Sequence, residues 1–255
     1  MLYYPRGDRS INVFNPKFPV ADSAYSPLKF MSQHAPPVPA QSNAPVPRRW
    51  RKAVERILIS EGQIASRVGQ MSRHIERDFA GREMAVISLL NGTVMFLADL
   101  IRHLSVPLRL DFIGVSSYRL GTESGDLVFT KELRLDVRGR DVLLVDDILD
   151  TGRTLHRVLG KVRALQPRRI KTCVLLNKAA RRVEDVEADY VGFEIPDFFV
   201  VGYGLDFGER YRNLPFVGVL HPHIYRTACQ RIDSAETKKV KARGNARSPI
   251  SPLSR

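Results

Sequence analysis

The most constraining feature of the chain is the stretch VLLVDDILDTGRTL at residues 142–155. Four apolar residues open it, which is the length and composition of a strand buried on both faces of a parallel sheet. Two adjacent aspartates follow, then a short polar loop, and then apolar residues with helical spacing at Leu155, Val158, Leu159 and Val162. A buried strand that leads through a polar loop into a helix places that loop at the carboxyl edge of an open α/β sheet, where such sheets bind ligands.

This loop has the chemistry of a site for a sugar phosphate. Residues 151–154 offer consecutive backbone N–H groups at a helix N-terminus, which favour a phosphate dianion. Gly152 lets the backbone approach that phosphate closely. Asp146 and Asp147 stand just upstream, where carboxylates can accept from sugar hydroxyls or approach a hydrated Mg²⁺. The alternative is an ordinary capped helix after a strand, which explains single residues but not the stretch as a whole.

The net charge of +13 raises the question of a polyanionic partner, but most of it lies at the two ends of the chain. Residues 1–52 carry +6, residues 231–255 carry +5, and the middle of the chain carries only +2. Neither end has a periodic apolar pattern. We therefore predict a disordered Pro-rich basic extension (1–52), one folded domain (53–230) and a disordered basic tail (231–255). Nucleic acid is not an expected partner, because charged tails of this kind are usually solvated.

Cysteine usage and hydropathy indicate a compartment. The two cysteines, Cys173 and Cys229, give no disulfide framework and fit a reducing cytosol. The first residues lack a signal-peptide pattern, and the most apolar run, 86–101, is interrupted by polar residues and a glycine. We expect a cytoplasmic protein without a membrane span.

Apolar patterns predict the other elements of the folded part. Ser60 and Gln63 resemble a capping box at a helix start. Residues 84–90, 108–117 and 170–176 predict buried strands, and with right-handed crossovers they give a doubly wound, mostly parallel sheet. Residues 118–126 predict a mobile loop that closes over a substrate, or an ordinary hairpin connection. The helix predicted after residue 93 is expected to have a buried face made of Val94, Leu97, Ala98, Ile101 and Leu104.

After residue 190 the pattern becomes less regular. Residues 190–195 and 199–203 predict short strands, followed by an aromatic segment punctuated by glycines. Such a segment can cover the sheet edge and hold a planar ligand, with Phe199 stacked on it. The alternative is that Phe198, Phe199 and Phe207 are simply core residues.

The stretch 142–155 resembles the binding signature for phosphoribosyl pyrophosphate (PRPP) of the type I phosphoribosyltransferases. Further stretches in family order narrow the resemblance to the hypoxanthine-guanine phosphoribosyltransferases and cover roughly residues 57–222. They are LNG at 90–92, FLADL at 96–100, VSSY at 115–118, LLNK at 175–178, VGFEIPD at 191–197, FVVGYGLD at 199–206 and YRNL at 211–214. The resemblance implies the type I fold, with a small hood over the carboxyl edge of the sheet.

The resemblance also implies an activity. The protein would be a Mg²⁺-dependent enzyme of purine salvage that transfers the phosphoribosyl group of PRPP to N9 of hypoxanthine or guanine, giving IMP or GMP and pyrophosphate. It would form a homodimer or homotetramer. The alternative from another class is a PRPP-sensing regulator that binds nucleic acid through the basic tails, and a third hypothesis is a xanthine-preferring transferase. A pure sensor does not need the whole catalytic set found here, namely Asp150, Lys178, Asp206 and Arg212.

Roles implied by the resemblance can be carried onto matching positions. Asp150 would be the general base at purine N7, Lys178 would donate to O6, and the remaining contacts would follow the order of the substrate. The predicted sets are Asp150, Thr151, Gly152, Arg153 and Thr154 for the 5′-phosphate; Asp146 and Asp147 for the ribose; Asn91, Gly92 and Arg212 for pyrophosphate; Lys178, Phe199, Val200 and Asp206 for the base; Asp206 for Mg²⁺; and Ser117 and Tyr118 for the closing loop.

Two positions depart from the family pattern. Asn91 stands where the family often has a basic residue in a non-proline cis peptide, so the pyrophosphate loop carries an amide without charge. Asp146 stands where Glu is frequent and is shorter by one methylene. The first departure predicts weaker PRPP binding, and the second is a mild one.

Overall fold

The computed structural model describes residues 42–117 and 127–225. None of the helices in these ranges is both long enough and apolar enough to span a membrane. The elements in chain order are η1 (Arg48–Trp50), β1 (Val54–Ile59), α1 (Glu61–Asp78), β2 (Met84–Leu90), α2 (Val94–Arg102), β3 (Leu108–Ser117), β4 (Leu127–Lys131), β5 (Asp141–Leu149), α3 (Arg153–Ala164), β6 (Arg169–Asn177), η2 (Ala179–Arg181), β7 (Tyr190–Glu194), β8 (Val200–Val201) and β9 (Val217–Leu220).

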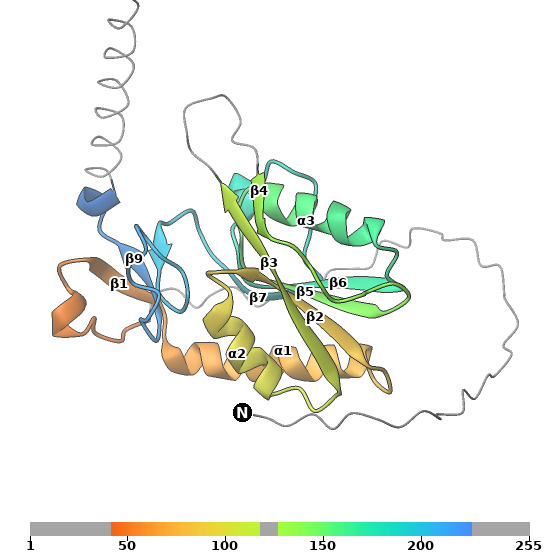
Figure 1. Cartoon of the computed structure of the whole chain (residues 1–255). Helices are drawn as coiled ribbons and strands as arrows, with labels where there is room; N and C mark the ends of the chain where they lie inside the picture. Colours follow the sequence, from red (N-terminus) through yellow and green to blue (C-terminus); the bar gives the residue numbers. More distant parts are fainter. Residues whose placement is uncertain (1–41, 118–126, 226–255) are drawn as a thin grey trace, which may run out of the picture. The chain divides into compact units, whose positions relative to one another are not determined.

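A six-stranded sheet with the order β4-β3-β2-β5-β6-β7 forms the centre of the fold. Its strands are parallel except β4, which pairs antiparallel with β3. The chain runs from β2 through α2 to β3 on one side and from β5 through α3 to β6 on the other. Helices α1 and α2 lie on one face of this sheet and α3 on the opposite face (Figure 1). The strand order therefore reverses between β2 and β5, and such a switch point opens a crevice at the carboxyl ends of the strands.

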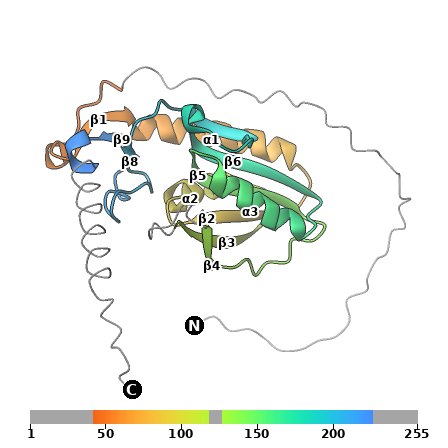
Figure 2. The same cartoon turned by 90° about the horizontal axis from the view of Figure 1, so that it is seen from above.

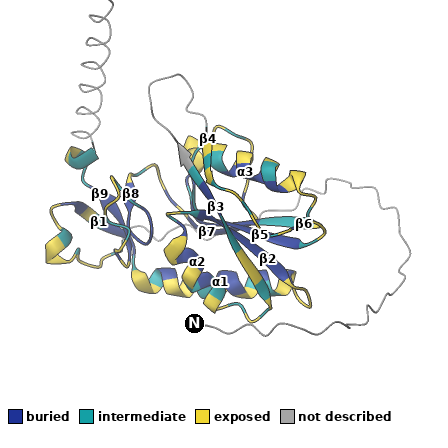
Figure 3. Ribbon diagram, viewed as in Figure 1, coloured by how far each residue is buried: buried dark blue, intermediate teal, exposed yellow. Residues whose placement is uncertain are grey.

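The two faces of the sheet build two separate cores. Along β5, Val142 and Leu144 pack with the core that includes α3, whereas Leu143 and Val145 pack with the core that includes α1 and α2. The central strands are mostly buried, and many exposed residues lie on the outer sides of the helices (Figure 3). Because both faces are covered, these strands appear in the sequence as continuous apolar runs rather than as alternating ones. This explains why β2 has the predicted bounds; β3 also has the predicted bounds, although its first half is partly exposed.

A second, three-stranded antiparallel sheet with the order β1-β9-β8 forms the predicted hood. Strand β1 precedes the large sheet and β9 follows it, and they pair from Val54 with Leu220 onward. The hood has its own small core, which includes Val54, Val201 and Phe216. Figures 1 and 2 both show this sheet beside the large one rather than within it. The doubly wound, mostly parallel fold with a hood is thus confirmed.

Strand β5 is longer than predicted, because the predicted strand ends at Val145 and the observed one continues to Leu149. Asp146 and Asp147 therefore lie within the strand and not in the loop after it. The neighbouring strand β6 is long enough to pair with this extension, up to Leu149 with Asn177. Carboxylates are uncommon in buried strands, so the sequence pattern ended the strand too early.

Two further local predictions are corrected. The strand predicted over 199–203 is only the two-residue β8, because Gly202, Tyr203 and Gly204 all have positive φ and turn the chain. In α2, Leu97 is buried as predicted, but Val94 is 42% exposed and Ala98 is also exposed. The buried face of α2 is instead made by Phe96, Leu97 and Leu100. Apolar residues nearly surround this helix, so periodicity alone could not choose the face.

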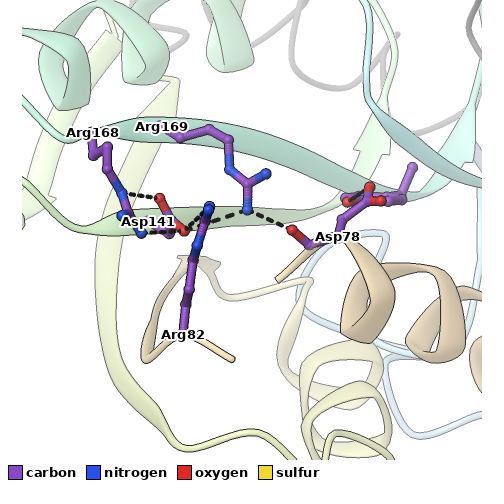
Figure 4. A network of polar contacts seen from close by, with 6 residues as sticks. Asp78, Arg82, Asp141, Arg168 and Arg169 are labelled. Carbon is purple, nitrogen blue, oxygen red and sulfur yellow. Dashed lines mark hydrogen bonds and ion pairs between the residues drawn. The ribbon is translucent and has the colours of Figure 1, made fainter. Parts of the chain in front are cut away.

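The amino edge of the sheet is held by an ion-pair network around Asp141 (Figure 4). The buried Asp141 carboxylate accepts from Arg168 at 2.8 and 2.7 Å and lies 3.4 Å from both Arg82 and Arg169. Burial alone would raise the pKa of Asp141, but these arginines lower it below its usual value overall. Arg169 also donates to the carbonyl of Asp78 at 2.9 Å. The network fastens the starts of β5 and β6 and the loop before β2.

The predicted closing loop over 118–126 and the predicted tail over 231–255 lie outside the described residues. Of the predicted N-terminal extension, only 42–52 is described; it contains η1, in which Trp50 packs edge-on against Tyr211 at 6.1 Å. The capping box at the start of α1 is confirmed, since Ser60 and Gln63 bond each other's backbone N–H groups.

Candidate active site

A polar cavity of about 310 Å³ lies at the carboxyl ends of β2 and β5, at the switch point of the sheet. The residues that line it come from segments that are far apart in the sequence: the loop after β2, the ends of β3 and β5, the start of β4, the start of α3 and the hood. The predicted site residues that line it are Asn91, Gly92, Asp146, Asp147, Asp150, Thr151, Gly152, Thr154, Asp206 and Arg212. The structure therefore brings the predicted phosphate, ribose and pyrophosphate groups to one place.

The start of α3 is built to receive an anion. Gly152 is the N-cap residue with φ of +88°, and no side chain among the described residues caps the helix. The first-turn N–H groups therefore remain for a ligand. The Thr151 carbonyl accepts from the N–H groups of Val183 and Glu184 at 2.9 and 3.1 Å, which holds the loop in shape. The side chain of Arg153 is exposed and does not line the cavity.

Asp146 and Asp147 present two carboxylates at the end of β5. Asp146 Oδ1 accepts from the Asp147 N–H at 2.9 Å and lies 3.4 Å from Thr93 Oγ1. Burial and the neighbouring Asp147 charge raise the pKa of Asp146 well above its usual value, and burial also raises the pKa of Asp147. Two acids held together in this way need an outside donor or cation, and sugar hydroxyls or a hydrated Mg²⁺ would supply one.

Asp150 and Lys178 approach each other from neighbouring strand ends. Lys178 is only 5% exposed, and its Nζ lies 3.9 Å from Asp150 Oδ2 and 3.7 Å from Asp197 Oδ1. Arg181 reaches the same two carboxylates at 3.4 and 3.9 Å. Asp150 Oδ1 is buried and has no hydrogen-bond partner among the described residues. An acceptor and a cationic donor are thus held side by side, with one carboxylate oxygen left for a ligand.

The hood contributes a charged pair. Arg212 donates from Nη1 to the Gly204 carbonyl at 2.9 Å, and its Nη2 lies 3.0 Å from Asp206 Oδ1 and 3.1 Å from Glu209 Oε2. The other oxygen of Asp206 accepts from the Glu209 N–H at 2.9 Å. These bonds fix the guanidinium and the carboxylate at the rim of the cavity, opposite the sheet edge.

The backbone itself closes the joint between hood and sheet. The Leu90–Asn91 peptide is cis. A Cβ on Gly92 would stand 1.7 Å from Asp147 Oδ2, and a Cβ on Gly204 would stand 1.9 Å from the Gly92 carbonyl oxygen. Only glycine allows these approaches, and Gly204 also has φ of +100°. In addition, Tyr203 of the hood donates its hydroxyl to Asp99 of α2 at 2.6 Å.

Of the predicted base-binding residues, Asp206 lines the cavity, whereas Lys178, Phe199 and Val200 lie outside its lining. Phe199 is 39% exposed, which disfavours the alternative that it is a core residue. Its ring meets Phe207 edge-on at 5.4 Å and stacks on Tyr225 at 5.0 Å. Val200 is buried in β8 and pairs with Val219. Ser117 is the last residue of β3, and Tyr118 lies outside the described residues.

Sequence reasoning missed several residues that shape this site. Thr93 contacts Asp146, while Arg181 and Asp197 join the Asp150–Lys178 pair. Arg182 holds the backbone behind Asp150. The available signal was the pair of arginines shortly after the Lys178 strand end, but basic residues in a loop are usually solvated, so this signal is weak.

Comparisons with known proteins agree with this geometry. A sequence model of the phosphoribosyl transferase domain matches residues 57–208. The solved structure of a hypoxanthine phosphoribosyltransferase from Staphylococcus aureus is similar, with a TM-score of 0.67 and 37% identity, covering 71% of this chain and 99% of that one. Fold and site thus define a phosphoribosyltransferase domain.

The relatives narrow the class further. The chain is 43% identical to the hypoxanthine-guanine phosphoribosyltransferase of Bacillus subtilis over 175 residues, which are 68% of this chain and 97% of that protein. The chain therefore belongs to the hypoxanthine-guanine phosphoribosyltransferase family. It is also 42% identical over 173 residues to the bifunctional protein TilS/HprT of Listeria monocytogenes, of which it spans 27% of the length.

Proposed function

We propose that the protein is a purine salvage enzyme that makes IMP or GMP, and pyrophosphate, from PRPP and hypoxanthine or guanine. The observation that carries this proposal is the meeting, at one sheet edge, of an uncapped helix start, two paired carboxylates, the Asp206–Arg212 pair and the Asp150–Lys178 pair. Family membership supports the same activity. The cytoplasm, expected from the sparse cysteines, is the proposed compartment.

Binding of PRPP follows from the lining of the cavity. The first-turn N–H groups of α3, with Thr151 and Thr154, would hold the 5′-phosphate, because a helix N-terminus attracts a dianion. Asp146 and Asp147 would accept from the ribose hydroxyls, which would add donors to those that Thr93 and the backbone already supply to Asp146. Asn91, Gly92 and Arg212 would contact the pyrophosphate. This arrangement fixes C1′ between the sheet edge and the hood.

The carboxylates of the site fit Mg²⁺, which prefers one or two carboxylates together with substrate phosphates and waters. We propose that Asp206, beside Arg212, would help to hold a Mg²⁺ that is bound to pyrophosphate, as the resemblance implies. When bound, the ion neutralises charge that develops on the departing pyrophosphate. Arg212 does the same from a position already fixed by Gly204 and Asp206, so little reorganisation is needed during the reaction.

At the base, Lys178 would donate to O6 and the free oxygen of Asp150 would accept the N7 proton. As N9 bonds to C1′, the C1′–O bond to pyrophosphate breaks, and the proton on N7 passes to Asp150. An ammonium only donates, so Lys178 selects oxopurines over adenine. Phe199 would stack on the base and the Val200 backbone would contact its edge, while Ser117 and Tyr118 would belong to the loop that excludes water from the cationic centre.

The test is steady-state nucleotide formation from PRPP and Mg²⁺ with hypoxanthine, guanine, xanthine and adenine. Product with hypoxanthine or guanine and none with adenine is expected. Product with xanthine alone would favour the alternative hypothesis of a xanthine-preferring transferase. Binding of PRPP without product from any base would overturn the proposal in favour of the PRPP sensor, whose nucleic-acid binding should then disappear when the basic tails are deleted.

We also propose that the chain forms a homodimer or homotetramer. Apolar side chains of α2 support this, since Val94 and Met95 are 42% and 40% exposed on one stretch of helix. Such patches commonly mark protein interfaces. Light scattering after size exclusion should give two or four chains for the wild type and fewer for Met95→Lys. A monomeric wild type at micromolar concentration would contradict this proposal.

A further inference from the structure

Arg182 directly follows η2, and its guanidinium donates hydrogen bonds to backbone carbonyls next to the cavity. Its Nε donates to the Asp150 carbonyl at 3.2 Å, and its Nη2 donates to the Leu149 carbonyl at 3.4 Å and to the side-chain oxygen of Asn177. Its Nη1 donates to the Val186 carbonyl. One side chain therefore ties together the end of β5, the end of β6 and the loop before β7.

The acceptors of Arg182 adjoin the two groups that would act on the base. Asp150 itself supplies one carbonyl, and Asn177 directly precedes Lys178 in the chain. The Leu149 carbonyl accepts from Arg182 and also from the Lys178 N–H at 2.9 Å. The backbone of Asp150 and that of Lys178 thus meet at a single carbonyl, and Arg182 holds it.

Chemistry explains why an arginine suits this place. A planar guanidinium carries five donors in a rigid fork, so it can satisfy several carbonyls at once, whereas an ammonium is a point donor. Burial lowers the pKa of Arg182, while the charges of Glu187 and Asp150 act in the opposite direction.

We propose that Arg182 is a positioning residue that sets the separation of the Asp150 carboxylate and the Lys178 ammonium, and so aligns N7 and O6 of the purine. Both atoms lie on the same edge of the base, so the two protein groups must keep a fixed spacing to reach them together. This inference rests on the proposed function. A displacement of about 1 Å at such a site can cost on the order of 100-fold in rate.

The experiment compares Arg182→Met with Arg67→Met. Arg67 is a matched control, because it is also partly buried and donates to two backbone carbonyls, those of Val191 and Gly192, each at 2.8 Å. It lies on α1 beside β7 and does not line the cavity. Measurements are kcat/KM for hypoxanthine, the Kd of PRPP by calorimetry, and the melting temperature. Each variant is also combined with Asp150→Asn.

For Arg182→Met we expect kcat/KM for hypoxanthine to fall by about 10- to 100-fold, with PRPP affinity within about threefold of the wild type. Arg67→Met should stay within about twofold in both quantities, even if the two variants melt alike. In the Asp150→Asn background, Arg182→Met should cost less than about threefold, because its effect passes through Asp150. Should Arg182→Met fail to fold, Arg182→Lys keeps the charge and is expected to lose about 10-fold.

The inference would be overturned if Arg182→Met and Arg67→Met lost kcat/KM for hypoxanthine equally. It would also be overturned if Arg182→Met reduced kcat/KM as much in the Asp150→Asn background as in the wild type. If Arg182→Met does not fold, a kcat/KM of Arg182→Lys within twofold of the wild type would overturn it. Turnover by the wild type reports separately on the proposed function. A wild type without turnover would overturn both.

Discussion

At the scale of single residues, the site contains buried charged groups that lack close hydrogen-bond partners among the described residues. Lys178 is buried, yet its two carboxylate neighbours lie at 3.7 and 3.9 Å, beyond ordinary hydrogen-bond distance. Asp150 keeps one oxygen unpaired. Buried polar groups are normally paired, so such exceptions are concentrated at functional sites. The purine O6 and N7 would complete both groups.

Lys178→Gln tests this reading of the residue. An amide both donates and accepts, so the preference for O6 over an amino group should weaken. We expect kcat/KM for hypoxanthine to fall by roughly 10- to 100-fold, the scale of one charge-assisted hydrogen bond, while the discrimination against adenine narrows. Initial rates with both bases at saturating PRPP measure this change. Undiminished hypoxanthine turnover would show that Lys178 does not contact the base.

At the scale of elements, β5 carries two buried aspartates in opposite environments. Asp141 begins the strand among three arginines, which lower its pKa, whereas Asp146 lies near its other end beside Asp147, and burial with that neighbour raises its pKa. The contribution of Asp141 to stability is present above the ordinary aspartate pKa of about 3.9 and is lost as pH falls through its lowered value. The cost of Asp146 is present above its raised pKa and disappears as pH falls.

Two amide variants of the same strand should therefore have effects of opposite sign. At pH 7.5, Asp141→Asn should lower the free energy of unfolding by about 2–3 kcal/mol, less than for a fully buried pair because two of its arginines are half exposed. Asp146→Asn should raise the free energy by about 1 kcal/mol, as neutralising a functional charge often does, and should weaken PRPP binding. Thermal unfolding at pH 7.5, pH 4 and pH 2 measures both differences. The Asp146 difference should shrink already at pH 4, whereas the Asp141 difference should persist at pH 4 and shrink only at pH 2, below the ordinary aspartate pKa.

Of the two variants, Asp146→Asn gives the stricter test, because a stabilising substitution is expected. A melting temperature for Asp146→Asn below that of the wild type at pH 7.5 would contradict the account of a buried Asp146 carboxylate that is destabilised by burial and by the neighbouring Asp147. A loss in Asp141→Asn that does not change with pH would show that the arginine network is not the source of its stability.

The elements also show which features of the fold could be predicted from the sequence and which could not. Strands β2 and β3 had the predicted bounds. Strand β2 is a nearly continuous apolar run, whereas in β3 apolar residues first alternate with Arg109 and Asp111. The face of α2 was not predictable, since apolar residues such as Val94 and Leu97 occur on nearly every side of it. Arg182 was equally invisible, because its role depends on three chain segments that meet only after folding. The helix start after β5 was predictable, because the polar loop and the helical spacing of apolar residues that follow it are local features of the sequence.

At the scale of the whole folded unit, the site exists only where the hood meets the sheet. Gly204 approaches the Gly92 carbonyl more closely than any side chain would allow, and Tyr203 bonds Asp99 beside it. Asp206 and Arg212 follow directly in the chain. The position of Asp206 and Arg212, the proposed pyrophosphate contacts, relative to the start of α3 is therefore set by this joint between the two sheets.

Gly204→Ala should open the joint. Its Cβ would meet the Gly92 oxygen and would also occupy a left-handed backbone conformation, so the hood loop must shift. We expect the KM for PRPP to rise by about 10-fold or more, since misplacement by about 1 Å is costly. Gly160→Ala is the control, because nothing lies within 4 Å of a Cβ there and alanine should stabilise α3 by about 0.5–1 kcal/mol. A Gly204→Ala protein with unchanged KM would show that the hood does not fix pyrophosphate.

The most direct test of the central claim compares PRPP binding with nucleotide formation in Asp150→Ala and the wild type. Because Asp150 would act on the base and supply only part of the phosphate loop, we predict that calorimetry with Mg²⁺ gives PRPP affinities within about tenfold of each other, while kcat with hypoxanthine falls by about 10²- to 10⁴-fold, the usual range for a general base. Asp150→Ala turning over hypoxanthine at the wild-type rate would contradict the assignment of this cavity as a catalytic site.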